Sequence, residues 1–133
     1  MKSVQNKNYD LCKYRINNAA ETLSTAKLCL DNKRYKDAIN RSYYAAFYAV
    51  KAVLAIEEID FKRHKDVVAY FNKYYVATNI FERSIGKKLA HLQQKRETSD
   101  YDDFYVASLE EANEQYFDAE AIIKAVKEHL DNI

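Results

Sequence analysis

Arg96, Asp100 and Tyr101 are the residues whose types and spacing are best suited to chemistry. An arginine guanidinium can hold a phosphate through two parallel hydrogen bonds, which predicts that Arg96 binds phosphate. Asp100 can accept a proton only in surroundings that favour its protonated form, and a tyrosine hydroxyl, with a reference pKa of about 10, is a poor base. The three residues therefore favour phosphate binding over proton transfer.

Each of the three residues also has a purely structural interpretation. Arg96 lies near the expected end of a helix, where a cation can bond to the last carbonyl groups. Asp100 and Tyr101 can hold their loop against the protein, with Tyr101 packed inward and Asp100 paired with a base such as Arg41. We expect Arg41 and the Asp100–Tyr101 dipeptide to be neighbours, because a buried carboxylate needs a charged or hydrogen-bonding partner.

A second set of candidates shares one helix face with Arg41. Tyr44 and Tyr48 lie three and seven residues after it, and their rings can stack a base or meet a second copy of the chain. A basic segment, Lys62-Arg63-His64, follows, in which His64 is either a helix-start and packing residue or a catalyst. We assign to nucleotide or RNA binding the residues Arg41, Tyr44, Tyr48, Lys62, Arg63 and His64.

The net charge of +1 hides an asymmetry along the chain. Residues 61–96 contain nine Lys or Arg and two acidic residues, whereas residues 97–121 contain nine acidic residues and no Lys or Arg. These blocks either pair with each other in the folded chain or form a positive strip for phosphate beside an acidic surface for a partner.

Composition predicts an all-α fold in one domain spanning residues 1–133. The chain has no proline and one glycine, so it lacks the turn residues that an all-β protein needs. Its N-terminus has no apolar run typical of a signal peptide, and no stretch approaches the roughly 18 apolar residues of a membrane span. We expect a soluble, cytoplasmic protein.

Metal-binding patterns are weak. Cys12 and Cys29 are 17 residues apart on one expected helix, about 25 Å, which is too far for a disulfide. The three histidines are scattered, and Asp102 with Asp103 lacks a third ligand. We therefore expect no metal and no cofactor.

The expected helix over residues 35–56 organises the chain. One stripe of small side chains recurs at helical spacing and would let a second helix pack closely against it. A neighbouring stripe of large side chains would fill the space on the other side. The small stripe is Ala38, Ser42, Ala45, Ala49 and Ala52, and the large stripe is Tyr43, Phe47, Val50 and Leu54.

Four further helices are expected around it. The first spans about 5–31, with a seam at Cys12, Ile16, Ala19, Leu23, Ala26 and Leu30. A third covers 65–77, and a fourth runs to about 94 after a break at 78–79, with Asn79 as its N-cap candidate. Residues 95–107 show no helical stripe. Ser108 and Glu111 then form a capping box that opens the last helix. The result is an antiparallel up-and-down bundle of four long helices, one of them split in two.

The chain resembles a HEPN domain (higher eukaryotes and prokaryotes nucleotide-binding) over about residues 10–130. The resemblance depends on four features in order: the sequence AINRSYYAAFYA at 38–49, His64 after a basic connector, RETSDY at 96–101, and an alanine-rich final helix. It is closest to the small, single-domain prokaryotic branch of the family.

The resemblance implies a helical bundle that commonly forms a homodimer and is often paired with a minimal nucleotidyltransferase, as toxin and antitoxin. Active branches are metal-independent RNases with an Arg-x(4–6)-His motif. Arg96 matches the arginine, but the residue five positions on is Tyr101, and no histidine follows until His129. Because histidine suits proton transfer near neutral pH, this departure favours binding over cleavage.

Three functions remain open. The first is a nucleotide- or RNA-binding partner of a nucleotidyltransferase. The second is an active RNase toxin that uses Arg96 with Asp100, Tyr101 or His64. The third is a helical dimerisation module without enzymatic activity.

Overall fold

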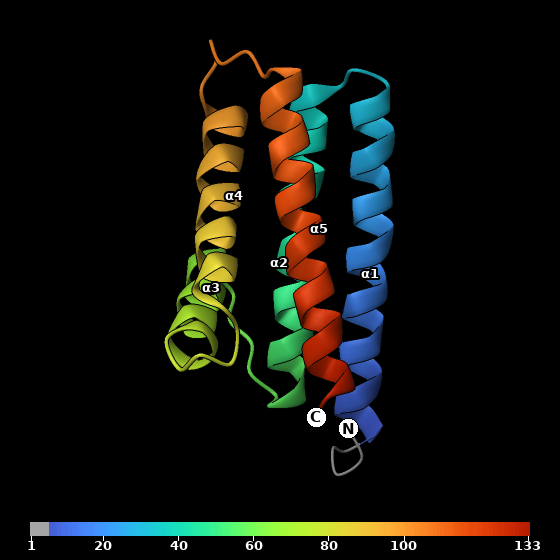
Figure 1. The fold of residues 1–133 in the computed structure, drawn as a ribbon, viewed down its shortest axis with the longest axis vertical. Helices are drawn as coiled ribbons and strands as arrows, with labels where there is room; N and C mark the ends of the chain where they lie inside the picture. Colours follow the sequence, from blue (N-terminus) through green and yellow to red (C-terminus); the bar gives the residue numbers. More distant parts are fainter. Residues whose placement is uncertain (1–5) are drawn as a thin grey trace.

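A computed structural model describes residues 6–133, which form five α-helices and one short π-helix and contain no strand (Figure 1). The elements are α1 (Asn6–Asp31), α2 (Tyr35–Ile56), α3 (His64–Phe71), the π-helix η1 (Asn72–Val76), α4 (Arg83–Tyr101) and α5 (Leu109–Asp131). The predicted all-α bundle is confirmed. None of the described helices is long and apolar enough to cross a membrane.

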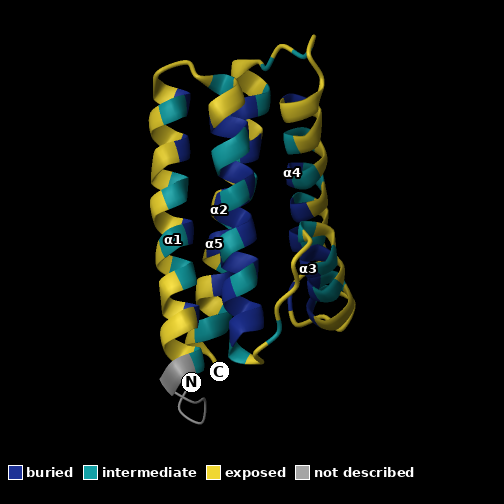
Figure 2. Cartoon of the chain, turned by 180° about the vertical axis from the view of Figure 1, so that it is seen from behind, coloured by how far each residue is buried: buried dark blue, intermediate teal, exposed yellow. Residues whose placement is uncertain are grey.

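The four long helices run alternately up and down, with α2 and α5 between α1 and α4 (Figure 1). The short α3 and η1 lie beside the first part of α4, on the side away from α1. α2 contacts all three other long helices and makes its most extensive contact with α1. Figure 2 shows that much of α2 is buried, whereas α1 keeps an exposed outer face.

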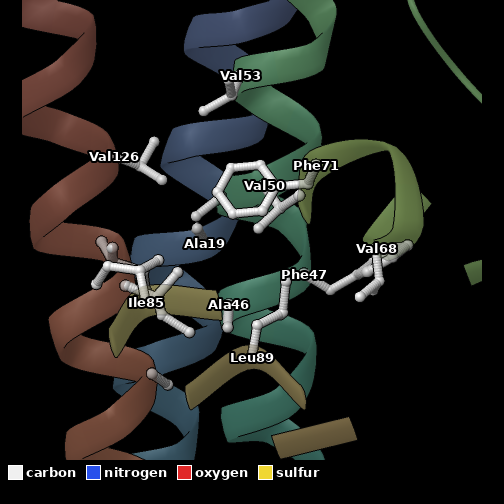
Figure 3. Packing of buried hydrophobic residues seen from close by; sticks show 14 of the residues in the cluster. Ala19, Ala46, Phe47, Val50, Val53, Val68, Phe71, Ile85, Leu89 and Val126 are labelled. Carbon is white, nitrogen blue, oxygen red and sulfur yellow. The ribbon is translucent and has the colours of Figure 1, made fainter. Parts of the chain in front are cut away.

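Both predicted stripes of α2 are buried. Every residue of the small stripe is fully buried, with Ala38 packed in a cluster with Leu30 and Ala52 in a cluster with Cys12. The large stripe belongs to the main core, where Phe47 and Val50 lie near Phe71 of α3 and Leu89 of α4 (Figure 3). Small side chains thus bring α1 close, and large ones fill the opposite side.

The expectation that residues 95–107 are irregular is wrong for its first half, because α4 continues to Tyr101. Its inward face here is polar: Ser99 is fully buried, and Arg96 is largely buried. A further contact joins Lys95 to Glu111 of α5 at 2.8 Å. Apolar periodicity cannot reveal a helix turn that buries polar side chains.

The third helix also differs from expectation. It begins at His64, and its last turn is the π-helix η1. Asn79 is not an N-cap; it has a left-handed φ of 65°, and α4 begins at Arg83 after Glu82. Gly86 of α4 lies against η1, where an added Cβ would sit 3.0 Å from Cγ1 of Val76, so a close contact explains this glycine.

The predicted capping box is present at the start of α5. The Glu111 backbone N–H donates to Ser108 Oγ at 3.1 Å, and the Ser108 backbone N–H donates to Glu111 Oε1 at 3.2 Å. The bond from Lys95, aided by the bonds at the cap, lowers the pKa of Glu111 to about 2. One carboxylate therefore caps α5 and ties it to the end of α4.

The close α1–α2 contact can be tested with two neighbouring alanines. Ala19 is fully buried in the main core, whereas Ala20 is exposed on the same helix. Ala19→Leu should lower the free energy of unfolding by about 1–3 kcal/mol through overpacking. Ala20→Leu is the matched control and should change it by less than about 0.5 kcal/mol. Urea unfolding followed by circular dichroism measures both, and equal effects would contradict the packing.

Candidate nucleotide-binding site

Arg96 lies inside α4 and points toward α2, with a side chain that is 14% exposed. Its Nη2 donates a hydrogen bond to the Tyr44 hydroxyl at 2.7 Å. Its guanidinium carbon lies 5.1, 5.3 and 5.9 Å from the ring centroids of Tyr43, Tyr44 and Tyr101. Three tyrosines thus surround the cation at cation–π distance, and Arg96 does not cap the end of its helix.

Asp100 is the carboxylate of this group. Its Oδ2 lies 3.1 Å from Arg96 Nε, one helix turn away, and accepts a hydrogen bond from Asn40 Nδ2 at 3.2 Å. The Arg96 Nε–H is not directed at the carboxylate, so this buried nitrogen has no hydrogen-bond partner among the described residues. The guanidinium therefore keeps donor capacity despite its ion pair. We call Arg96, Tyr43, Tyr44, Asn40, Asp100 and Tyr101 the Arg96 cluster.

The expected pairing of Arg41 with Asp100 is replaced by a contact through Asn40. Nε and Nη2 of Arg41 both donate to Asn40 Oδ1, at 3.0 and 2.7 Å, while the amide nitrogen of Asn40 reaches Asp100. The Arg41 guanidinium also lies 5.0 Å from the Tyr44 ring centroid. Arg96 takes the charge of Asp100 because it lies on the same helix, one turn away.

His64 reaches the same tyrosines from the start of α3. Its Nδ1 lies 3.1 Å from the Tyr43 hydroxyl, and its ring stacks on Phe47 with centroids 4.1 Å apart. It also meets the edge of Tyr44 at 5.7 Å. Burial lowers the pKa of His64, and the charges of Arg96 and Lys51 lower it further. The fold thus places a neutral imidazole beside the Arg96 cluster.

Tyr43 is a core residue, as expected, but it also belongs to the site. Burial raises the pKa of its hydroxyl well above the usual range. A hydroxyl that keeps its proton can donate to His64 Nδ1, which leaves the ring proton on Nε2. The sequence analysis did not assign Tyr43 and Asn40 to the site. The only signal for them in the sequence is that they precede Tyr44 by one and four residues, respectively.

The other candidates lie at varying distances from the cluster. Tyr48 is half-buried with its ring centroid 6.0 Å from that of Tyr44. Lys62 and Arg63 are exposed before α3, and Arg63 forms an ion pair with Asp66 at 2.9 Å. Within residues 6–133 the hydrogen bonds and the ion pair of Arg63 go to Asp66 and not to the Arg96 cluster.

The opposed charge blocks meet at the seam between α4 and α5. Lys95 pairs with Glu111 across this seam, whereas Arg96 pairs with Asp100 within α4. These contacts support the interpretation that the blocks pair with each other. The basic residues near α3 remain on the surface.

The environment of His64 predicts a pH dependence. A pKa below the ordinary value of about 6.5 means that the unfolded chain binds this proton more tightly than the folded chain. The contribution of this pKa difference to the free energy of unfolding is complete above about pH 6.5. It is lost as the pH falls through the pKa of His64 in the folded chain. The His64 imidazole should therefore titrate below pH 6.5 in an NMR experiment, with the resonance assigned by its loss in His64→Gln. Titration at or above that value would contradict this environment.

Comparison with known proteins shows the family of this chain. A profile of the HEPN domain matches residues 12–129. A Thermotoga maritima protein named UPF0332 protein is 31% identical over 128 residues, covering 96% of this chain and 97% of its own. Two Methanocaldococcus jannaschii proteins each align over 115 residues, or 86% of this chain: "Putative toxin MJ0605" at 33% identity over 85% of its length, and "Putative toxin MJ0142" at 29% over 78%. Because the profile spans most of the chain and these relatives align over nearly all of it, the protein belongs to the HEPN domain family.

Proposed function

We propose that this HEPN protein binds RNA or a nucleotide through the Arg96 cluster, as a homodimer and as the partner of a minimal nucleotidyltransferase in a toxin–antitoxin-like pair. The observation that carries the binding proposal is the Arg96 guanidinium held among three tyrosines with one carboxylate beside it. The family and the relatives named as toxins support the toxin–antitoxin context.

The charge balance of the Arg96 cluster together with the neighbouring Arg41 suits a phosphate. Arg96 and Arg41 lie 5.3 and 5.0 Å from the same Tyr44 ring, and Asp100 supplies one negative charge against their two positive charges. Guanidinium groups form strong, charge-assisted hydrogen bonds to phosphate oxygens. The tyrosine rings fix the direction of the arginines without neutralising them.

Tyr101 adds a surface for a base. It is 73% exposed, yet its ring centroid lies 5.9 Å from the Arg96 guanidinium. A base stacked on this ring would place its phosphate near the arginine, which is the combination that proteins use to hold single-stranded nucleic acid.

Binding can be tested by fluorescence anisotropy with a labelled single-stranded RNA at low salt. Arg96→Ala should weaken the affinity about 10- to 100-fold, the value of a charged hydrogen bond. Affinity should also fall as salt rises. Arg83→Ala, which removes the same charge from the exposed start of α4, is the control and should cost less than about threefold.

Equal losses in the two variants would indicate non-specific attraction and overturn the site. Arg96→Lys keeps the charge but not the planar fork, so it should bind nearly as weakly as Arg96→Ala. Thermal unfolding of each variant distinguishes lost binding from lost folding.

His64 favours a second candidate function, a metal-independent RNase. The family's active branches require a histidine, and His64 lies 3.1 Å from Tyr43 and beside Tyr44, the tyrosine bonded to Arg96. In this alternative Arg96 would stabilise charge on the phosphate, and His64, with Asp100 or Tyr101, would transfer protons.

We nevertheless expect purified protein to cleave single-stranded RNA weakly or not at all in the presence of EDTA. The position expected for the motif histidine holds Tyr101, and a general base typically contributes about 10²–10⁴ in rate. Gel assays of wild type, Arg96→Ala, His64→Asn and Tyr101→Phe decide the matter. Robust cleavage that disappears in Arg96→Ala and in either other variant would establish the RNase and identify its proton-transfer residue.

A further inference from the structure

A second cluster of polar side chains lies on the seam between α4 and α5. His91 of α4 faces Glu114 and Asp118, which are one turn apart on α5. His91 Nδ1 lies 3.2 Å from Glu114 Oε1 and 3.6 Å from Asp118 Oδ2. One ligand atom from each residue lies within 4.8 Å of the other two.

These distances fit a metal ion better than a single hydrogen bond. Nitrogen and oxygen ligands lie about 2.0–2.2 Å from Zn²⁺, so neighbouring ligands of a tetrahedral ion lie about 3.3–3.6 Å apart. A protonated Nδ1 has one N–H, which can point well at only one acceptor. Here two carboxylate oxygens converge on the same nitrogen.

Gln115 provides an independent observation. It is fully buried, its Nε2 lies 3.5 Å from His91 Nδ1, and its Oε1 has no hydrogen-bond partner among the described residues. The two ends of a glutamine amide are assigned by their surroundings. In the reversed assignment the oxygen faces the cluster, where it can bind a cation or a water on it. In that assignment the amide nitrogen becomes the end without a partner among the described residues, so an ion at the cluster would engage one end of the side chain only.

The charges around His91, Glu114 and Asp118 also favour a bound cation. Two carboxylates face one imidazole, and the Asp118 side chain is only 18% exposed. The charge of Lys88 also acts on Asp118, which makes Lys88 a competing cation. An ion bound between the three ligands would neutralise the carboxylates directly.

We propose that His91, Glu114 and Asp118 form a binding site for a divalent transition-metal ion, with Zn²⁺ as the best match to one imidazole and two carboxylates. The ion joins α4 to α5, and Gln115 supports it from the buried side. The site is separate from the Arg96 cluster, so a test of metal binding is independent of a test of RNA binding.

Zn²⁺ binding to metal-free protein can be measured by competition with a chromogenic chelator. Wild type should bind one ion per chain, and His91→Gln and Asp118→Asn should each weaken binding by more than about tenfold. Lys88→Met should strengthen it, because the competing cation is removed. His129→Gln and the double variant Cys12→Ser/Cys29→Ser are controls and should bind as wild type does.

NMR of the wild-type chain gives a second measurement that needs no variant. Zn²⁺ should shift the His91 imidazole resonances and leave those of His64 unchanged. Co²⁺ should give a d–d spectrum without a thiolate charge-transfer band. Absence of one-to-one binding, indifference to Asp118→Asn, or loss of binding in the cysteine variant would overturn the proposal.

Discussion

The close approach of α1 to α2 across fully buried alanine and serine side chains is the constraint on which the other contacts depend. It places α2 inside the bundle, with small residues on one side and large ones on the other. Only one face of α2 is then left to carry polar groups. That face holds Arg41, Tyr44 and Tyr48, and α4 covers part of it with Arg96. The candidate site thus lies on the face of α2 that the packing of its small and large side chains leaves free.

A largely buried arginine needs compensation for its lost hydration. The bond to the Tyr44 hydroxyl, the neighbouring rings and the Asp100 carboxylate supply it, and the Arg96 pKa remains above its usual value despite burial. The cation is therefore held in a fixed direction before any ligand arrives. A ligand phosphate would meet an oriented donor, which reduces the entropy lost on binding.

Regular apolar spacing was enough to predict the bundle, both stripes of α2 and the capping box at Ser108. It failed where the buried face is polar, as in the last turns of α4, where Ser99 and Arg96 point inward. The same limit hid the site role of Tyr43, which resembles an ordinary core residue. It also hid the group formed by His91 and the two α5 carboxylates, because residues so far apart in sequence meet only after α4 and α5 have packed.

The contacts of Glu111 link local unfolding at the start of α5 to the end of α4. It holds the first turn of α5 through Ser108 and the end of α4 through Lys95, the residue next to Arg96. Fraying of α5 at its start therefore removes a partner from α4, and the two helix ends behave as one cooperative unit rather than as independent termini. Glu111 thus links the two ends of the connecting segment 102–108, whose Tyr105 and Ala107 also pack against the bundle. The local stability of the candidate site is therefore set, in part, by a helix cap on another element.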